Sequence, residues 1–256
     1  DRNGHGTHIA SILAASDKLK GKDGDEDGDE DGDEDGDEEN GSDSLDRFAG
    51  MAPNASLVMV RAFGEDGGGT YADVIRGINW IVANKARHNI RVLNCSFSAP
   101  VSSFYWEDPI NQAIMKAWKA GIVVVVSAGN AGPDPMTIGV PGNVPYGITG
   151  GAVTRSYPPS CPSDDRLASF SSVGPRYAGF GKPDVVAPGG HIVGIMESKA
   201  RIPTLFPQFS SPEKNLFVMS GTSQAAATVS GIAALMIQAN PGLSPDDVKC
   251  GLMSTA

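Results

Sequence analysis

The sequence predicts an α/β fold with three α/β/α layers and a mostly parallel sheet. Short runs of β-branched apolar residues have the length of buried strands, and amphipathic stretches of helical length separate them. The composition agrees with this class. Apolar residues make up 40% of the 256 positions, which suits one α/β domain with a sizeable core.

The first half of the chain alternates between helix and strand. The expected strands are apolar runs bounded by turn residues or helices, and the expected helices repeat apolar residues at helical spacing. In chain order these elements are a helix at about 6–16, a strand at 56–63, a helix at 71–87, a strand at 92–98, a helix at 110–118 and a strand at 122–126.

Beyond residue 130 the chain is rich in Gly and Pro, and the expected strands shorten to 148–153 and 183–189. The strongly apolar run at 222–239 predicts a helix. It should end there, because Asn, Pro and Gly follow it directly. Ser244 then begins a last helix. Serine is a favoured N-cap, and Pro245 suits the first helical position.

The net charge of −10 belongs to one segment. Residues 23–39 repeat DGDE and hold 13 of the 30 acidic residues, which leaves 17 acidic and 20 basic residues elsewhere. Self-repulsion and periodic Gly predict a disordered surface loop in this acidic insert. The remaining chain shows no basic stripe of the kind that follows phosphates, so we expect no nucleic-acid partner.

The acidic insert also matches the spacing of a calcium loop, from Asp23 to Glu34. A DGDE repeat generates this match automatically, and Glu30 stands where such loops carry an apolar residue. We therefore expect non-specific attraction of Ca²⁺ by many carboxylates, with no assignable metal ligands.

The cysteines and the hydropathy exclude two further classes. The three cysteines lack zinc-type spacing and predict no disulfide framework. They are Cys95, Cys161 and Cys250. No apolar run reaches the roughly 18 residues of a membrane-spanning helix.

Three short segments carry candidate chemistry. NGHGTH at 3–8 places His5 between glycines at a helix start. SAGN at 127–130 places Asn130 beyond the carboxyl end of a strand, where its amide is free to donate to an oxyanion. SGTSQA at 220–225 places Ser223 at the start of the apolar helix, where free N–H groups favour negative charge. Taken singly, each also fits a loop histidine, a plain turn or an N-cap serine.

Together and in this order, these segments resemble the subtilisin-like serine proteases, the subtilases or peptidase S8 family. The intervening stretches APNASLVMVRAF, VLNCSFS, ASFSSVGP and KPDVVAPG carry the same resemblance. It covers nearly all of the chain outside the insert. It implies one catalytic domain over 1–256, interrupted by the insert at 23–39 and incomplete at its N-terminus.

The resemblance implies a serine endopeptidase with three site residues. His5 matches the general base, and Ser223 matches the nucleophile. Asn130 matches the oxyanion-hole residue, acting with the backbone N–H of Ser223. His8, the second histidine of the motif, is expected to be structural.

The resemblance also implies the substrate-binding segments. One strand is expected to pair with an extended substrate. Small uncharged residues are expected to form the pocket for the residue before the cleaved bond. We therefore expect cleavage after medium or large apolar residues rather than after Arg or Lys. The positions concerned are Ser96, Phe97, Ser98, Ala128, Gly129, Gly139 and Gly142.

The Asp of the family's triad has no match. In the family it precedes the His by tens of residues, at the end of a central strand, and only Asp1 precedes His5 here. We expect the sequence to start downstream of this Asp, within a complete protease. We also expect the 256 residues alone to be nearly inactive and unstable, because the missing strand leaves backbone groups unpaired.

Two alternatives stay open. One is a non-catalytic binding protein of subtilase fold, for which Ala227 leaves room because the family usually has Pro there. The other is an acidic calcium-binding module that rests on the insert alone. The main hypothesis implies protein or peptide substrates, a monomer, and no membrane partner. It implies an extracellular or cell-envelope location and no cofactor for the chemistry. A structural Ca²⁺ is compatible with the family, without assignable ligands.

Overall fold

The computed structural model describes most of the chain outside the acidic insert. The described ranges are 1–18, 47–154, 165–175, 179–211 and 215–256. The acidic run at 23–39, with its calcium-loop spacing, and Cys161 lie outside the described residues.

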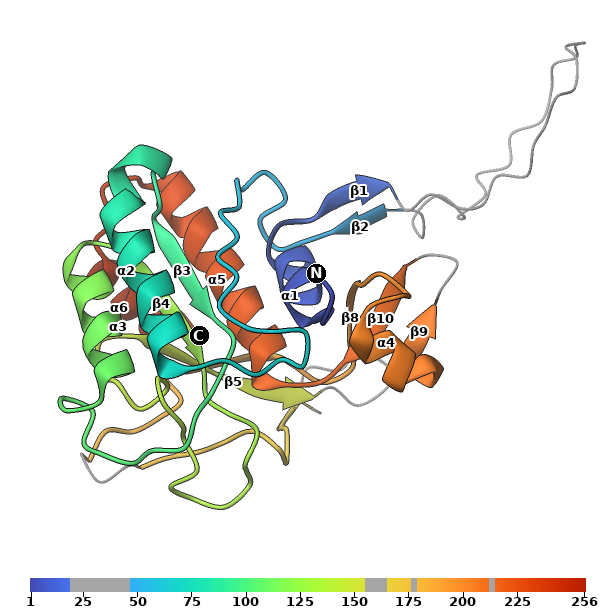
Figure 1. Ribbon diagram of the computed structural model, residues 1–256. Coiled ribbons are helices and arrows are strands. Elements are labelled where there is room, and N and C mark those ends of the chain that lie inside the picture. The colour runs from blue at the N-terminus through green and yellow to red at the C-terminus, as the bar shows by residue number, and fades with distance from the viewer. Residues whose placement is uncertain (19–46, 155–164, 176–178, 212–214) are drawn as a thin grey trace, which may run out of the picture.

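The described helices and strands follow one another in an α/β order (Figure 1). The helices are α1 (His5–Ala14), α2 (Tyr71–His88), α3 (Pro109–Lys119), α4 (Arg201–Leu205), α5 (Thr222–Ala239) and α6 (Pro245–Thr255). The strands are β1 (Ser16–Lys18), β2 (Arg47–Ala49), β3 (Val92–Cys95), β4 (Val123–Ser127), β5 (Ile148–Thr154), β6 (Arg166–Leu167), β7 (Val185–Pro188), β8 (Ile192–Ile195), β9 (Ser210–Ser211) and β10 (Leu216–Met219).

A mostly parallel sheet forms the centre of the fold. β3, β4, β5 and β7 run parallel, and the short β6 pairs antiparallel with β5. The register sets Val125 opposite Ile148 and Gly150 opposite Val185. Parallel strands need helical crossovers, which α3 supplies between β3 and β4. The predicted fold class is confirmed.

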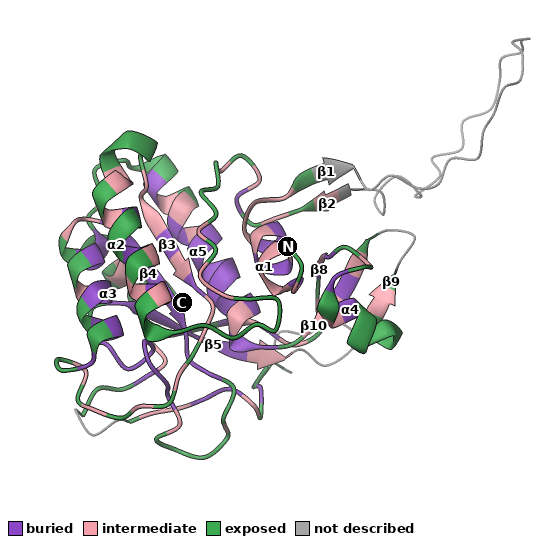
Figure 2. Cartoon of the chain, viewed as in Figure 1, coloured by how far each residue is buried: buried purple, intermediate pink, exposed green. Residues whose placement is uncertain are grey.

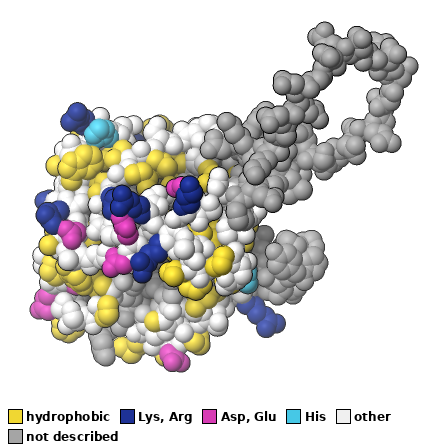
Figure 3. All heavy atoms as spheres, turned by 45° about the vertical axis from the view of Figure 1, so that its right-hand side comes forward, with side chains coloured by type: hydrophobic (Ala, Val, Ile, Leu, Met, Phe, Trp, Pro, Cys, Tyr) yellow, Lys and Arg dark blue, Asp and Glu magenta, His cyan; other side chains and the backbone are white. Residues whose placement is uncertain are grey.

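Helices cover both faces of this sheet and complete the three layers. α2 and α3 pack together on one face, while α5 crosses the strands on the other face with α1 beside it (Figure 1). The β4 residues Val123 to Val126 are at most 1% exposed, because both sheet faces are covered (Figure 2). On the face drawn in Figure 3, acidic and basic side chains are interspersed.

Local sequence signals start and stop several of these helices. Asp108 accepts hydrogen bonds from the N–H groups of Ile110 and Asn111 and so caps α3. Ser244 and Asp247 form a reciprocal capping box on α6. The predicted helix at 222–239 has the bounds of α5. None of the helices in the described ranges combines the length and hydropathy that crossing a bilayer requires.

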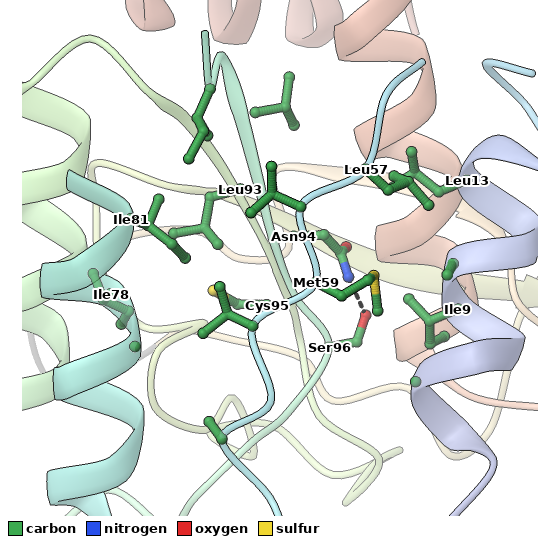
Figure 4. Close-up of a pocket in the computed structure, with 18 of the residues that line it drawn as sticks. Ile9, Leu13, Leu57, Met59, Ile78, Ile81, Leu93, Asn94, Cys95 and Ser96 are labelled. Atoms are coloured by element: carbon green, nitrogen blue, oxygen red, sulfur yellow. Dashed lines mark hydrogen bonds between the residues drawn. The ribbon is translucent and has the colours of Figure 1, made fainter. Parts of the chain in front are cut away.

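One predicted strand is wrong. Residues 56–63 contain no strand, and Leu57, Val58 and Met59 are exposed. A strand needs a hydrogen-bonded neighbour, and the described residues give this segment none. Instead the segment lines a groove of about 360 Å³, whose other walls are α1, α2 and β3 (Figure 4). We call this the β3 groove.

Two small antiparallel sheets were not predicted. β1 pairs with β2, and β10 lies between β8 and β9 in a separate sheet. The β10–β8 pair packs over α1, because Gly194 lies against the ring of His8. This small sheet therefore fixes the helix that carries His5.

A buried cluster of charges ties α6 to the loop before β5. Lys182 and Asp184 form an ion pair of 2.6 Å with both side chains almost fully buried. Lys249 of α6 contacts the same carboxylate at 3.2 Å and donates to the carbonyls of Pro145 and Gly147. Burial lowers the pKa of Lys182 to about 8, although Asp184 opposes that shift.

Removing the shared carboxylate should cost more than removing one ammonium group. Asp184→Asn leaves the buried Lys182 and the part-buried Lys249 without a counter-charge, for a loss of about 3–5 kcal/mol in unfolding free energy. Lys182→Met keeps the pair between Lys249 and Asp184 and should cost less than half of that. Urea unfolding of both variants of the full-length protein measures the difference. Equal losses would contradict this account of the cluster.

Candidate active site

The structure brings the three motif segments to one end of the parallel sheet. Asn130 follows β4 at its carboxyl end, and Ser223 is the second residue of α5. His5 is the first residue of α1, which packs along α5. Ligands bind at this edge in open α/β sheets, beyond the carboxyl ends of the strands.

At the N-terminus of α5, the side chains of Gln224 and Asn130 lie close to the backbone of Gly221. Gly221 precedes it without a side-chain cap, and a Cβ added there would lie 2.8 Å from Gln224 Oε1 and 3.3 Å from Asn130 Nδ2. A helix start has N–H groups without intrahelical partners and a partial positive charge. The backbone N–H of Ser223 is one of these groups.

The amide of Asn130 is oriented by Thr222. Asn130 Oδ1 accepts from Thr222 N at 2.9 Å and from Thr222 Oγ1 at 3.0 Å, while Gly129 N donates to the same hydroxyl. Since a backbone N–H is always a donor, the amide atom facing it is the oxygen. Asn130 is exposed, and its Nδ2 therefore remains free to donate beside the start of α5.

Ser223 is held by the strand segment that follows β3. Its Oγ donates to the carbonyl oxygen of Ser96 at 3.4 Å, and Ser96 Oγ donates to the carbonyl of Ser223 at 3.0 Å. Within the described residues the His5 ring makes no hydrogen bond. The serine hydroxyl thus points at Ser96 rather than at the imidazole.

Burial lowers the pKa of His5, with no charged neighbour contributing. The carboxylate nearest in sequence, Asp1, accepts from the N–H groups of Gly4 and Thr7. It accepts from Thr7 in the first turn of α1, where the helix dipole favours a negative charge, and it does not contribute to the pKa shift of His5. Within the described residues, nothing orients His5 in the way that a triad carboxylate does.

His8 has the structural position expected for it. The ring is fully buried, with Nε2 3.1 Å from the carbonyl oxygen of Phe217 and Nδ1 3.5 Å from Gln224 Nε2. Since a carbonyl only accepts, Nε2 carries the proton. Burial lowers the pKa of His8 to about 4, against the effect of the Phe217 hydrogen bond.

The expected substrate segments also meet in the structure. Ala99 bridges to Val140, and Gly139 N donates to the carbonyl of Ala128. A Cβ on Gly139 would lie 2.0 Å from Ser98 Oγ, and one on Gly129 would lie 3.2 Å from it. The Ser98 hydroxyl therefore lies against both glycines. Gly142 packs on the same turn, where a Cβ would be 3.2 Å from the Gly139 carbonyl.

Sequence reasoning missed several residues that position the site. Thr222 and Asp1 were given no positioning role, although Thr222 lies inside the SGTSQA motif and Asp1 lies four residues before the first residue of α1. Asn94 and Ser230 were also missed, since their role depends on contacts between β3 and α5. A polar residue inside an apolar strand is the one signal that marks Asn94 beforehand.

The whole chain, residues 1–256, matches the sequence model of the subtilase family. The chain belongs to this family. It is 37% identical over 254 residues to serine protease AprX of Bacillus subtilis (strain 168), an alignment that covers 97% of this chain and 52% of AprX. It is 32% identical to subtilisin DY of Bacillus licheniformis, covering 100% of this chain and 71% of that protein. The subtilase described here thus spans about half the length of AprX.

Solved structures agree with this family. Sphericase superimposes with a TM-score of 0.74 at 25% identity, covering 100% of this chain and 70% of its own. The S41 psychrophilic protease gives a TM-score of 0.72 at 26% identity, again over 100% of this chain and 70% of that one. Both alignments cover the whole of this chain, and so include His5, Asn130 and Ser223.

The buried His8 should make the subtilase less stable as pH falls. An unfolded histidine binds its proton near pH 6.5 and His8 near 4, so the unfolded state binds more protons between these values. The unfolding free energy should therefore fall over this window by up to about 3 kcal/mol. His8→Gln should remove most of that slope. Urea unfolding of the full-length protein from pH 7 to pH 4 measures it.

Exposed His88 supplies the matched control, since it lies on the surface of α2. His88→Gln should keep the wild-type slope. A wild-type slope in His8→Gln would show that another group controls the acid loss.

Proposed function

We propose that this subtilase is a serine endopeptidase with Ser223 as nucleophile, His5 as general base and Asn130 as oxyanion donor. One observation carries the proposal. Thr222 fixes the oxygen of the Asn130 amide, which leaves Nδ2 free beside the open N-terminus of α5. Two donors beside the same helix start support a binding site for a tetrahedral oxyanion.

The proposed reaction is acyl transfer. Ser223 Oγ attacks the peptide carbonyl while His5 accepts the hydroxyl proton and then gives it to the leaving amine. Water then attacks the acyl-enzyme with His5 again as base, and Ser223 is released. The oxyanion receives hydrogen bonds from Ser223 N–H and Asn130 Nδ2, and no step requires a cofactor. Burial keeps His5 neutral near pH 7, the form that a base needs.

The third member of the triad is proposed to lie outside these 256 residues. The β3 groove supports this, because it is lined by His5 at α1 and by β3, which forms one edge of the parallel sheet. Exposed Leu57 and Met59 form its outer wall (Figure 4). An extended segment in this groove pairs with β3 and brings a carboxylate to the imidazole.

Protein or peptide chains are the proposed substrates. An extended substrate pairs with Ser96-Phe97-Ser98 as an added strand, which aligns its scissile carbonyl with Ser223. The uncharged walls at Ala128 and Gly139 favour apolar residues before the cleaved bond. The proposal retains a monomer, with no nucleic-acid or membrane partner, acting outside the cell or in its envelope.

Fluorophosphonate labelling of the full-length protein tests the proposed function. Labelling should occur on the wild type and be lost in Ser223→Ala. Asn130→Ala should lower kcat for a peptide by about 100- to 1,000-fold, because it removes one of the two oxyanion donors. The isolated 256 residues should label far more slowly. Folded full-length protein without Ser223-dependent labelling would establish the non-catalytic alternative.

Ser98 should limit the size of the residue accepted before the cleaved bond. Its hydroxyl lies against Gly129 and Gly139, so Ser98→Gly opens space between them. Wild type should cleave peptides after apolar residues in preference to Arg or Lys. In Ser98→Gly the ratio of kcat/KM for Phe over Ala should rise by about tenfold, as for one to two extra methylenes in a pocket. A preference for basic residues, or an unchanged ratio, would contradict the assignment of Ser98 to this pocket.

A further inference from the structure

A chain of side-chain hydrogen bonds joins β3 to α5 beneath the nucleophile. Ser230 Oγ donates to Asn94 Oδ1 at 3.0 Å, and Asn94 Nδ2 donates to Ser96 Oγ at 2.9 Å. Ser96 Oγ donates in turn to the carbonyl of Ser223 at 3.0 Å. Figure 4 shows the Asn94–Ser96 bond at the floor of the β3 groove.

The direction of every proton in this chain is determined by its last member. The Ser223 carbonyl only accepts, so the single proton of Ser96 Oγ points to it. Ser96 Oγ then receives its own hydrogen bond from Asn94, which assigns the facing amide atom as nitrogen. The other amide atom is oxygen and accepts from Ser230. The donors are thus ordered from Ser230 toward Ser223.

These hydrogen bonds connect the β3 segment to α5 at two positions along the helix. Ser223 and Ser230 are seven residues apart on α5, which places them two turns apart on the same helix face. Asn94 and Ser96 are two residues apart along the strand and lie on the same sheet face. Asn94 bonds to Ser230 directly and to Ser223 through Ser96, so its amide fixes the position of α5 along the strand.

We propose that Asn94 is a positioning residue for catalysis, which sets Ser223 Oγ relative to the substrate-pairing segment through Ser96. This inference rests on the proposed function, because the same segment is proposed to hold the scissile bond. A displacement of the nucleophile by about 1 Å costs on the order of 100-fold in rate. Loss of the Asn94 bond frees Ser96 Oγ to turn away from Ser223. Substrate affinity depends on the strand backbone and is retained.

Asn94→Asp in the full-length protein tests this ordering of donors. A carboxylate only accepts, so Ser96 Oγ turns toward it and releases the Ser223 carbonyl. At pH 8, kcat for a peptide should fall by about 10- to 100-fold, with KM within about twofold. As pH falls, the part-buried carboxyl gains a proton and becomes a donor to Ser96. The ratio of variant to wild-type kcat should therefore rise as pH falls.

That ratio isolates the new carboxyl from other ionisable groups. The ionisable residues lining the β3 groove around Asn94 are His5, His88, Arg91 and Cys95. These groups are the same in both proteins, so their effects cancel in the ratio. Burial raises the pKa of Cys95 to about 12, above the range used.

Asn111→Asp is the matched control. Asn111 is fully buried on α3, donates to Asn143 and shares no hydrogen bond with Ser230, Asn94, Ser96 or Ser223. Its substitution introduces a buried carboxyl but should leave the kcat ratio independent of pH. Should Asn94→Asp not fold, Asn94→Leu has similar volume and no donor, and a fall in kcat with unchanged KM supports the inference.

The outcomes separate this inference from the proposed function. Wild type without Ser223-dependent fluorophosphonate labelling overturns both. Wild-type labelling with a pH-independent ratio in folded Asn94→Asp overturns the positioning role alone, as does a loss confined to KM. A ratio that rises with falling pH in Asn94→Asp, and stays flat in Asn111→Asp, supports it.

Discussion

Close contact between α5 and the parallel sheet is the constraint on which the site depends. A Cβ added to Gly150 of β5 would lie 3.5 Å from the backbone N and Cα of Ala226, and Ala225 is fully buried beside it. Small residues therefore let the helix backbone rest almost directly on strand backbone. The N-terminus of α5 carries Ser223, so any side chain that lifts the helix also moves the hydroxyl away from Ser96.

The start of α5 differs from the other long helices in how its N–H groups are used. Thr70, Asp108 and Ser244 cap α2, α3 and α6 with their own side chains. At α5, Gly221 offers no side chain, and the Thr222 N–H is taken by Asn130 from the neighbouring loop. One donor is thus used to orient an amide, and the next stays available. A helix start left open in this way suits a transient anion better than a permanent cap.

Patterns confined to one element could be predicted from the sequence, and pairings between distant elements could not. The bounds of α5 followed from its local pattern, whereas the grouping of His5, Asn130 and Ser223 was expected only from the resemblance to subtilases. The apolar run at 56–63 satisfied the pattern of a strand, but a strand exists only where a neighbour completes its ladder. The β8–β10 pair was missed because its partners are separated by some twenty residues of unpatterned sequence. The partners of Asn94 could not be predicted, because they depend on how α5 lies on β3.

Within the described residues, the β3 groove lacks a strand that pairs with β3, and the part-buried His5 beside it lacks a charged partner. Burial lowers the pKa of His5 without a compensating charge, so the imidazolium formed during acyl transfer is disfavoured in these residues alone. The groove beside it exposes Leu57 and Met59 and borders the edge strand β3. In the proposed enzyme one extended segment pairs with β3 and also supplies the carboxylate, because a strand that covers the apolar wall ends at the imidazole. Folding of the sheet and activation of His5 are then a single event rather than two.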